Sequence, residues 1–586
     1  MLKDTYCGDL RLSDEGRKVR VAGWVHRRRD HGGLIFIDLR DERGIVQIVF
    51  DPSLTEAHAL AERARPEWVL AIEGTVRARS AETVNTNLAT GEVEIAPASC
   101  SILAEARTPP FYINEPSDVD EQLRLRHRYL DLRRPEIGAA IRLRHEVVRF
   151  MRAFLYDRGF VEVETPTLIR STPEGARDFL VPSRTQPGRF FALPQSPQIM
   201  KQLLMASGFE RYFQFARCYR DEDFRANRVA EHTQLDLEMS FVDEEDVMGL
   251  IEDLYTATAR EFWTGTIAAT PFPRLDFTDC MERFGIDRPD LRYGLEFVDL
   301  ADEVRESGFQ VFSSALAEGG EVRAIRAPGL GELPRRQIDA LTEIARSGGA
   351  KGLAYIGFLP GEIRSPLTRF LSDAELAGIR TRTGAVDGDL VVAVADSPSV
   401  VASSLHAVRE DLARRLDLRD ANVLSFAWVT GFPLLEWHPD EQRWDATHNP
   451  FSGFREEDRS LLDSDPGQVI AKQYDLVLNG AEIGGGSVRI GSRADQEKVF
   501  GLMGHSKEQM QERFGVILDA LEYGVPPEGG VGMGLDRFIM SLARTENIRD
   551  VIAFPKASSG ADVLMDAPAA VDEAQLRELG LQLRPS

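Results

Sequence analysis

Residues 213–225 read FQFARCYRDEDFR and residues 232–241 read HTQLDLEMSF, and these two stretches decide the fold of the largest part of the chain. Residues alternate as in a strand over Phe213–Tyr219, the run RDEDFR (220–225) breaks the alternation, and residues 232–241 resume it. This pattern predicts an antiparallel hairpin with a long loop. Alternation also places Gln234, Asp236 and Glu238 on one face of the second strand. If Arg220 reaches that face, a cation and several acceptors converge on one ligand; ordinary surface ion pairs are the alternative.

Two further segments have residue types suited to binding anions. In QSPQIMKQLL (195–204), a Ser-Pro helix start leaves Gln198 and Lys201 three residues apart on one helix face, which suits a carboxylate. In NGAEIGGGSVRI (479–490), Glu482 is a candidate metal-binding acid and Arg489 a second carboxylate-binding cation. Each segment taken alone is also common on surfaces with no ligand.

The stretch GGVGMGLDRFIMSL (529–542) predicts a glycine-rich strand that runs into a helix, with Arg537 at the mouth. Glycines let a backbone approach a planar ligand, and a fixed arginine can hold a phosphate. The sequence has no GxxxxGK[ST] loop, and no GxGxxG follows a predicted strand. A nucleotide, if one is used, is therefore held in neither the P-loop nor the Rossmann manner.

The amino-terminal part reads as five short strands within residues 19–103, and an oligonucleotide-binding (OB) barrel is the leading interpretation. The first forty residues contain nine Lys and Arg against six Asp and Glu, whereas the whole chain of 586 residues has a net charge of −24. An acidic chain repels a polyanion on average. This local reversal permits contact with a nucleic acid.

Between the barrel and the hairpin lies the basic run RLRHRYLDLRR (124–134), which predicts either a solvated helix face or a contact with phosphates. A helix pattern follows over 141–155 and a strand over 160–165, before Pro166. From about 290 to 420 the sequence contains many Gly-rich turns and no cluster of polar residues typical of a catalytic site. This part reads as an insertion into a domain formed by its flanks.

Composition excludes several other classes. With 43% hydrophobic and 28% charged residues the chain is typical of a globular protein, so disorder and fibrous structure are excluded. Its four cysteines are scattered, with no Cys-x-x-Cys pair, and predict neither zinc nor disulfides. The polar start MLKDTYCGDL is unlike a signal peptide, and no run is long enough for a membrane helix. We expect a cytoplasmic protein with no membrane partner.

Taken together, the motifs resemble the bacterial-type aspartyl-tRNA synthetases, a family of class II enzymes (subclass b), over nearly the whole chain. FVEVETP (160–166), CYRDEDFR (218–225) and GMGLDR (532–537) are similar to the three class II motifs. TPEGARDF (172–179), QSPQIMKQ, EHTQLDLE and GGGSVRI resemble the aspartate-specific signatures. The class I signatures HIGH and KMSKS are absent.

The resemblance implies an α+β multidomain fold: an OB-fold barrel, a catalytic domain on an antiparallel sheet and an α+β insertion. The expected divisions are an anticodon-binding domain (1–106), a hinge (107–134), the first catalytic part (135–288), an inserted GAD-type domain (289–420), the second catalytic part (421–558) and a carboxyl-terminal extension (559–586). It further implies a homodimer that activates L-aspartate with ATP and Mg²⁺ and charges tRNA(Asp).

Site residues carried over from the resemblance fall into groups. Those implied to bind aspartate are Glu174, Ser196, Gln198, Lys201, Arg220, Asp236, His448 and Arg489. Those implied to bind ATP are Arg220, Asp221, Glu222, His232, Glu482, Gly534, Leu535, Asp536 and Arg537, with Arg220, Glu222 and Arg537 as the catalytic set. The implied Mg²⁺ ligands are Asp475 and Glu482, and the implied anticodon contacts are Arg29, Phe36 and Gln47.

Two residues bear on the choice of tRNA. His31 resembles relatives that charge both tRNA(Asp) and tRNA(Asn), whereas Thr83 is not the glycine expected of that relaxed type. Relaxed specificity is therefore our hypothesis, and strict tRNA(Asp) specificity is the alternative. A synthetase for asparagine or lysine, and a non-catalytic nucleic-acid-binding paralogue, are further alternatives. The Lys201 and Arg489 pair argues against the first, and the retained Arg220, Glu222, Glu482 and Arg537 argue against the second.

Overall fold

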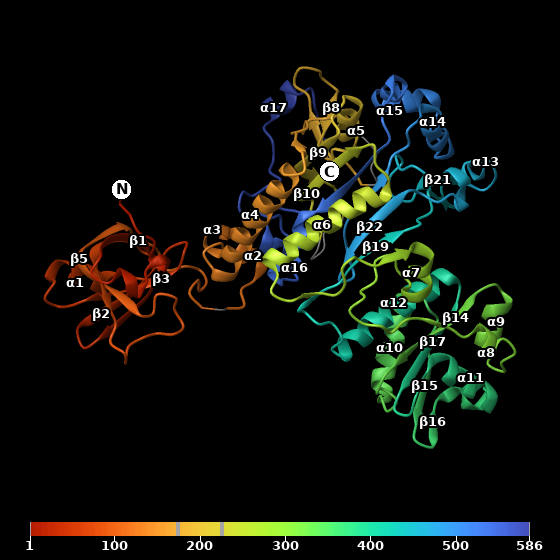
Figure 1. Ribbon diagram of the computed structural model, residues 1–586, viewed down its shortest axis with the longest axis horizontal. Coiled ribbons are helices and arrows are strands. Elements are labelled where there is room, and N and C mark those ends of the chain that lie inside the picture. Colours follow the sequence, from red (N-terminus) through yellow and green to blue (C-terminus); the bar gives the residue numbers. More distant parts are fainter. Residues whose placement is uncertain (1, 116, 172–175, 223–227, 585–586) are drawn as a thin grey trace. The chain divides into compact units, whose positions relative to one another are not determined.

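The computed structural model describes residues 2–115, 117–171, 176–222 and 228–584 (Figure 1). Contacts divide the chain into two compact units: residues 1–139 with 562–567, and residues 140–561 with 568–586. The six divisions expected from the resemblance stay a prediction. None of the described helices is long and apolar enough to cross a membrane. Cys7, Cys218 and Cys280 are buried, and Cys100 is half-buried.

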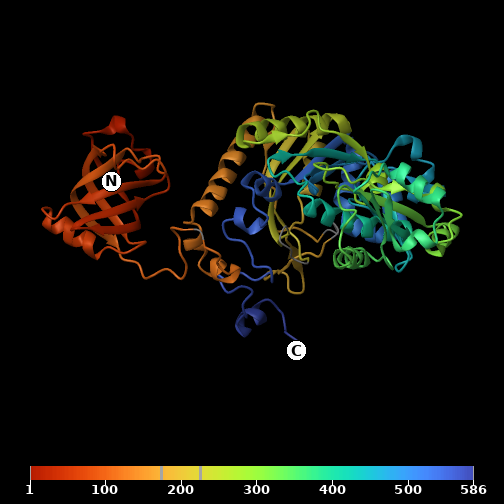
Figure 2. The same cartoon turned by 90° about the horizontal axis from the view of Figure 1, so that it is seen from below.

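The first unit contains a closed five-stranded barrel in the order β1-β2-β3-β5-β4, seen at the amino-terminal, red end of Figure 2. Its only parallel pair among the described strands is β3 with β5. Alternating side chains such as Val19, Val21, Ile35 and Ile37 fill its interior. The strands are β1 (Lys18–His31), β2 (Leu34–Arg40), β3 (Ile45–Phe50), β4 (Val69–Ala78) and β5 (Val93–Ala104). Helix α1 (Thr55–Arg63), which the sequence pattern did not predict, separates β3 from β4.

After the barrel come the short helices α2 (Glu121–Arg126) and α3 (Arg128–Asp131), which contain most of the basic run. The prediction of a solvated helix face was wrong for Arg128, which is 1% exposed. Asp131 is fully buried and forms ion pairs with Arg124, Arg128 and Arg134. One buried carboxylate thus pairs with three of the five arginines, all within seven positions of it along the chain.

The second unit is built on an eight-stranded sheet in the order β12-β19-β22-β23-β24-β10-β9-β6. Its strands are β6 (Val161–Glu162), β9 (Arg211–Tyr219), β10 (Glu231–Ser240), β12 (Arg274–Asp276), β19 (Phe426–Thr430), β22 (Gln473–Leu478), β23 (Ala481–Val488) and β24 (Glu528–Gly534). The six central strands are antiparallel, and the two edge pairs, β6 with β9 and β12 with β19, are parallel. The predicted hairpin is β9 and β10, with Asp236 opposite Gln214. Strands from both sides of residues 290–420 share this sheet.

Helices pack against the sheet and bury its apolar face. The main core joins α4 and α6 to the sheet and to α16, through residues such as Met151, Ile251, Trp428 and Phe538. The helices around the sheet are α4 (Pro135–Tyr156), α5 (Gln198–Ala206), α6 (Glu244–Phe262), α7 (Phe277–Phe284), α13 (Leu461–Ser464), α14 (Arg493–Leu502), α15 (Lys507–Ala520), α16 (Leu535–Ala543) and α17 (Glu573–Glu578). Short strand pairs complete this part: β7 (Leu180–Pro182) with β8 (Phe190–Ala192), β11 (Thr266–Ile267) with β18 (Val423–Leu424), and β20 (Leu435–His438) with β21 (Arg443–Ala446).

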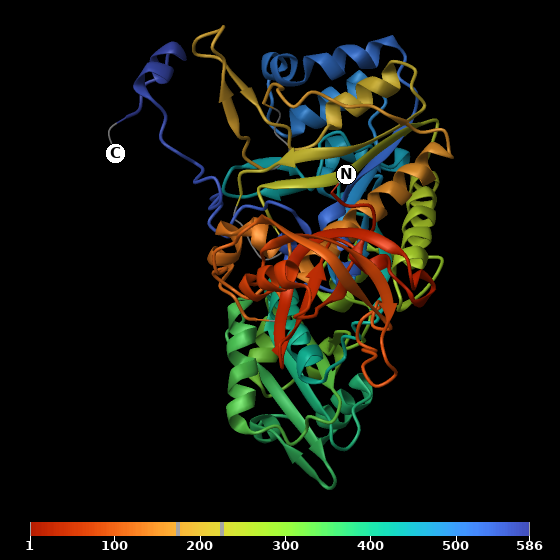
Figure 3. The same ribbon diagram turned by 90° about the vertical axis from the view of Figure 1, so that its left-hand side faces the viewer.

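The segment around 290–420 forms a separate five-stranded sheet in the order β13-β14-β17-β15-β16, drawn in green in Figures 1 and 3. Its strands are β13 (Val298–Asp299), β14 (Glu321–Ala327), β15 (Ala354–Leu359), β16 (Glu362–Arg364) and β17 (Leu390–Asp396). One face carries a core with α10 (Arg335–Ser347) and α12 (Pro398–Arg415), and the other a core with α8 (Ala301–Val304), α9 (Gln310–Ala317) and α11 (Asp373–Thr383). A sheet covered on both sides is an α+β module with its own cores.

We predict that Asp131→Ala destabilises the first unit by about 3 kcal/mol, because it leaves Arg128 buried without this carboxylate. Scanning calorimetry of the full chain measures the effect as a lowered transition temperature. Asp118→Ala removes an exposed acid from the same segment and should change the transition little. Equal shifts for the two variants would contradict the structural role of Asp131.

Candidate active site

Two neighbouring pockets lie over the glycine-rich strands β23 and β24, and Arg220, Gln234, Glu482 and Gly532 line both. The first pocket contains most residues implied to bind aspartate: Ser196, Gln198, Lys201, Asp236, His448 and Arg489. The second contains most residues implied to bind ATP: Glu222, His232, Gly534, Asp536 and Arg537. The fold thus brings together residues that are more than 300 positions apart. Glu174 lies outside the described residues.

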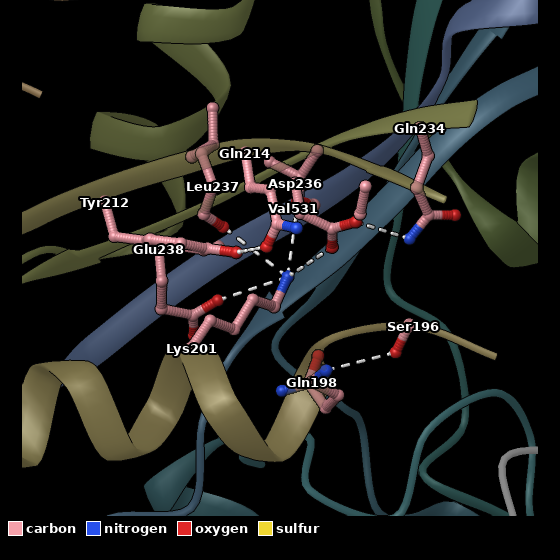
Figure 4. A network of polar contacts seen from close by, with 12 residues as sticks. Ser196, Gln198, Lys201, Tyr212, Gln214, Gln234, Asp236, Leu237, Glu238 and Val531 are labelled. Atoms are coloured by element: carbon pink, nitrogen blue, oxygen red, sulfur yellow. Dashed lines mark hydrogen bonds and ion pairs between the residues drawn. The ribbon is translucent and has the colours of Figure 1, made fainter. Parts of the chain in front are cut away.

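Lys201 is the centre of the first pocket's polar network (Figure 4). Helix α5 directs its ammonium Nζ toward β10, where it lies 3.1 Å from Asp236 Oδ1 and 3.3 Å from Glu238 Oε2. It also donates to the carbonyl oxygens of Leu237 and Val531, at 3.5 and 3.3 Å. The side chain is 2% exposed. A buried ammonium with this many acceptors is held in one position, as recognition of a small ligand requires.

Arg489 forms the second cation of the pocket. Its Nε and Nη2 donate to the two carboxylate oxygens of Glu238 at 2.7 and 3.0 Å, and its Nη1 donates to Ser487 Oγ at 2.7 Å. Glu238 is completely buried and bridges Arg489 to Lys201. The sequence pattern placed Glu238 on the correct face as one of several acceptors, but Glu238 was not among the site residues implied by the resemblance. Its position two residues after Asp236 was the only signal for it.

Glycines in the neighbouring strand make room for these acids. A methyl group on Gly530 of β24 would lie 2.0 Å from Glu238 Oε2, and one on Gly485 of β23 would lie 2.1 Å from Asp475 Oδ1. Real Cβ atoms do not approach so closely. The glycines of β23 and β24 therefore leave space for the carboxylates of the neighbouring strands.

The second pocket is lined by three arginines and by three acids, Glu222, Glu482 and Asp536. Arg220, Arg228 and Arg537 line it, and burial together with the neighbouring arginines lowers the pKa of Arg537 although Glu482 opposes the shift. Among the described residues, the Nε of Arg220 is buried without a hydrogen-bond partner. Burial, followed by the charge of Arg220, lowers the pKa of His232 to about 4, so its ring is neutral near pH 7. A neutral ring beside converging cations suits a base and the phosphates of a nucleotide.

Three residues implied to bind ATP are placed differently from the rest. Asp536 lines the second pocket, but its carboxylate accepts from the backbone N–H of Thr233 at 2.9 Å and pairs with Arg144 of α4. It therefore positions the start of α16. The side chain of Leu535 is 1% exposed and belongs to the main core. Asp221 lines neither pocket, and its backbone N–H bonds to the carbonyl of Arg177.

Asp475 and Glu482 face the first pocket and were the implied Mg²⁺ ligands. Burial, and next the charge of Glu482, raise the pKa of Asp475 well above its usual range. His448 Nε2 lies 3.4 Å from Asp475 Oδ2, and burial lowers the pKa of His448. The described residues contain no cluster of three or more ligands suited to a metal. Two carboxylates beside a pocket lined by arginines nevertheless fit Mg²⁺, which commonly takes few protein ligands and completes its shell with phosphates and water.

In the barrel, Arg29, Phe36 and Gln47 lie on adjacent strands. Arg29 is opposite Phe36, and Gln47 is opposite Asp38 on the face that also carries Phe36. Arg29 Nη2 donates to Asp38 at 2.9 Å, and Gln47 donates to Glu94 at 3.2 Å. His31 contacts Phe36 edge-on, with ring centroids 5.8 Å apart. Thr83 lies in the loop between β4 and β5, where its hydroxyl donates to the carbonyl of Ser80.

Comparison with known proteins defines the class. Residues 120–558 match the family described as tRNA synthetases class II (D, K and N), and residues 19–103 match the OB-fold nucleic acid binding domain. The chain therefore belongs to the class II tRNA synthetase family, as the motifs predicted. The predicted OB barrel and antiparallel catalytic sheet are confirmed with it.

Similar proteins narrow the comparison. A Moorella thermoacetica protein named aspartate–tRNA(Asp/Asn) ligase is 53% identical, covering 98% of this chain and 96% of that protein. One of the same name from Heliobacterium modesticaldum is 52% identical (98% and 95%), and the aspartate–tRNA ligase of Geobacillus kaustophilus is 50% identical (99% and 99%). The crystal structure of asparaginyl-tRNA synthetase from Pyrococcus horikoshii with asparaginyl-adenylate has a TM-score of 0.59 at 18% identity, covering 95% of this chain and 98% of that one. The last likeness concerns the fold alone.

We predict that Glu238→Gln destabilises the second unit by about 3 kcal/mol or more, because Arg489 and Lys201 both lose a buried counter-charge. Urea unfolding of the full chain measures this as a lower midpoint. The control is Glu343→Gln on α10, where the side chain is exposed. A midpoint like that of the control would show that Glu238 does not hold the two cations.

Proposed function

We propose that this protein is an aspartate–tRNA ligase. It first joins L-aspartate to ATP, giving aspartyl-adenylate and pyrophosphate, and then transfers the aspartyl group to the 3′ end of tRNA(Asp). The observation that carries the proposal is the pair of buried cations, Lys201 and Arg489, in a pocket that adjoins a second pocket lined by arginines. The names of the similar proteins support the same activity.

In the first pocket, Lys201 and Arg489 would bind the β-carboxylate of aspartate, with Gln198, Asp236 and His448 beside them. Ser196, and Glu174 by its place in the sequence, would act near the amino group. Asparagine differs from aspartate only in having an amide in place of that carboxylate. An amide would turn N–H donors toward the donors of Lys201 and Arg489 in place of an accepting oxygen, and a buried polar group left without its hydrogen bond costs about 1–3 kcal/mol. This argues against an asparagine or lysine enzyme.

In the second pocket, Arg220 and Arg537 would hold the α- and γ-phosphates, and Glu222 and His232 would contact the adenine. The α-carboxylate of aspartate attacks the α-phosphorus, and negative charge develops on the nonbridging oxygens. Fixed guanidinium groups stabilise that charge without any protein nucleophile. Asp475 and Glu482 would hold Mg²⁺, which supplies further positive charge at the phosphates. A non-catalytic paralogue would have no reason to retain this set.

The barrel would recognise the anticodon. Phe36 lies on a strand face between Arg29 and Gln47, and an aromatic ring there can stack on an unpaired base while the polar side chains contact its edges. We hypothesise that tRNA(Asn) is also charged, because His31 contacts Phe36 directly and because several relatives are named for both tRNAs. Thr83 is the residue that favours the strict alternative.

We also propose that the protein is a homodimer that works in the cytoplasm, where tRNA and ATP are found. Large apolar side chains are exposed on α4, β6, the segment after β6 and the β7–β8 hairpin, among them Tyr156, Val161, Leu168, Leu180 and Phe190. Exposed apolar groups that gather on neighbouring elements are typical of subunit interfaces. The class II motif FVEVETP begins beside them.

Charging of separated tRNAs tests the proposed function. We expect the purified protein to attach radiolabelled aspartate to tRNA(Asp) and, more slowly, to tRNA(Asn), with asparagine and lysine inactive in ATP–pyrophosphate exchange. Charging of tRNA(Asp) alone would reject relaxed specificity and leave the enzyme class intact. Absence of exchange with all three amino acids would favour the non-catalytic alternative.

Substitutions separate the two units by function. Arg537→Ala should lower ATP–pyrophosphate exchange at least a hundredfold, because a cation that stabilises transition-state charge is lost. Phe36→Ala should reduce kcat/KM for tRNA charging about tenfold or more, since stacking on one base contributes about 1–3 kcal/mol, and should leave exchange unchanged. Loss of exchange in Phe36→Ala would contradict this division.

A further inference from the structure

Behind the two cations lies a third buried acid, Glu528, at the start of β24. It is 2% exposed. Its Oε1 accepts from Gln202 Nε2 at 3.1 Å, and Gln202 Oε1 in turn accepts from Gln198 Nε2 at 3.0 Å. Its backbone carbonyl accepts from the N–H of Arg489 at 2.9 Å. Within the described part of the chain, Glu528 Oε2 has no hydrogen-bond partner. Neither the sequence motifs nor the proposed function assigns this residue a role.

The groups that face Glu528 come from three places: Lys201 and Gln202 on α5, Glu238 on β10, and Arg489 after β23. Tyr474 of β22 lies next to Arg489, and Glu244 of α6 next to Tyr474. The two cations already have carboxylates. Asp236 pairs with Lys201, and Glu238 pairs with both Lys201 and Arg489. If Glu528 were ionised, three negative carboxylates would therefore face only two positive side chains, Lys201 and Arg489, in a buried region.

The charge of this cluster bears directly on an incoming carboxylate. With Glu528 neutral, two cations balance two carboxylates, and the β-carboxylate of aspartate meets no net opposing charge. With Glu528 ionised, the cluster has a charge of −1 before the substrate arrives. Charges separated by low-dielectric protein interact strongly, so the substrate carboxylate would be repelled. ATP binds in the other pocket, away from Glu528.

We propose that Glu528 is a positioning and specificity-determining residue for aspartate: it stays protonated behind Lys201 and Arg489, and its ionisation weakens binding of the substrate carboxylate. This inference rests on the proposed function. Burial, and next the charge of Glu238, raise the pKa of Glu528 to about 8, whereas the hydrogen bond from Gln202 lowers it. A carboxyl group with a raised pKa is neutral below that value and loses its proton as the pH rises through it.

The KM for aspartate in ATP–pyrophosphate exchange, measured from pH 6.5 to 9, tests the proposal. About a tenth of Glu528 is neutral one pH unit above its pKa, so the KM for aspartate should rise about tenfold from pH 7 to pH 9. The KM for ATP should change little. Glu528→Gln is neutral at every pH and should abolish most of the rise, while Glu343→Gln should retain it. The amino group of aspartate also titrates at high pH, but it affects the KM of the wild type and of both variants equally.

A second variant keeps the test decisive if Glu528→Gln does not fold. Gln202→Met removes the hydrogen bond that favours the ionised form, so the midpoint of the rise should move to higher pH whatever the baseline KM. A flat wild-type profile, an equal rise in Glu528→Gln, or an unmoved midpoint in Gln202→Met would each overturn the role of Glu528. Absence of aspartate-dependent exchange at every pH would instead contradict the proposed function.

Discussion

Glu238 holds Lys201 and Arg489 together inside the second unit, and the binding site depends on this contact. Charges of this kind are stable away from water only when they are paired and hydrogen-bonded. Glu238 therefore has to meet an ammonium from α5 and a guanidinium from the end of β23 at the same point. That requirement fixes the distance between the helix and the sheet. It also gives the pocket two cations whose positions are set before any ligand binds.

The sheet can accommodate this cluster because its neighbouring strands have almost no side chains there. Gly530 and Gly532 on β24, and Gly484, Gly485 and Gly486 on β23, lie against the acids of β10 and β22 or against each other. The same absence of side chains leaves an open surface above the strands, where the two pockets join. The glycines of β23 and β24 thus allow the acids to pack between the strands and also leave the two pockets open to a ligand.

The two pockets differ in the arrangement of their charged side chains. In the first, nearby carboxylates balance the cations, so the net charge is small, and the role proposed for Glu528 is a fine adjustment of that charge. In the second, three arginines and three acids line the pocket, but Glu222 pairs with Arg228 and Asp536 with Arg144 of α4. Arg220 and Arg537 are therefore the cations suited to the negative charges of a nucleotide. The acidic total charge of the chain therefore says little about either site.

Local pattern was enough to predict several elements and contacts. The alternation around 213–241 predicted the β9–β10 hairpin, and the Ser-Pro start predicted α5 with Gln198 and Lys201 on one face, because both depend on residues close in sequence. The match of the motifs to one family predicted the OB barrel and the class II sheet. The tertiary structure alone decided which charges meet. The pairing of Arg489 with Glu238 and of Asp536 with Arg144, and the contact of the buried Glu528 with Gln202, join segments more than 200 residues apart, whose spacing carries no signal. Long-range ion pairs depend on how strands and helices pack, and only the folded chain defines that packing.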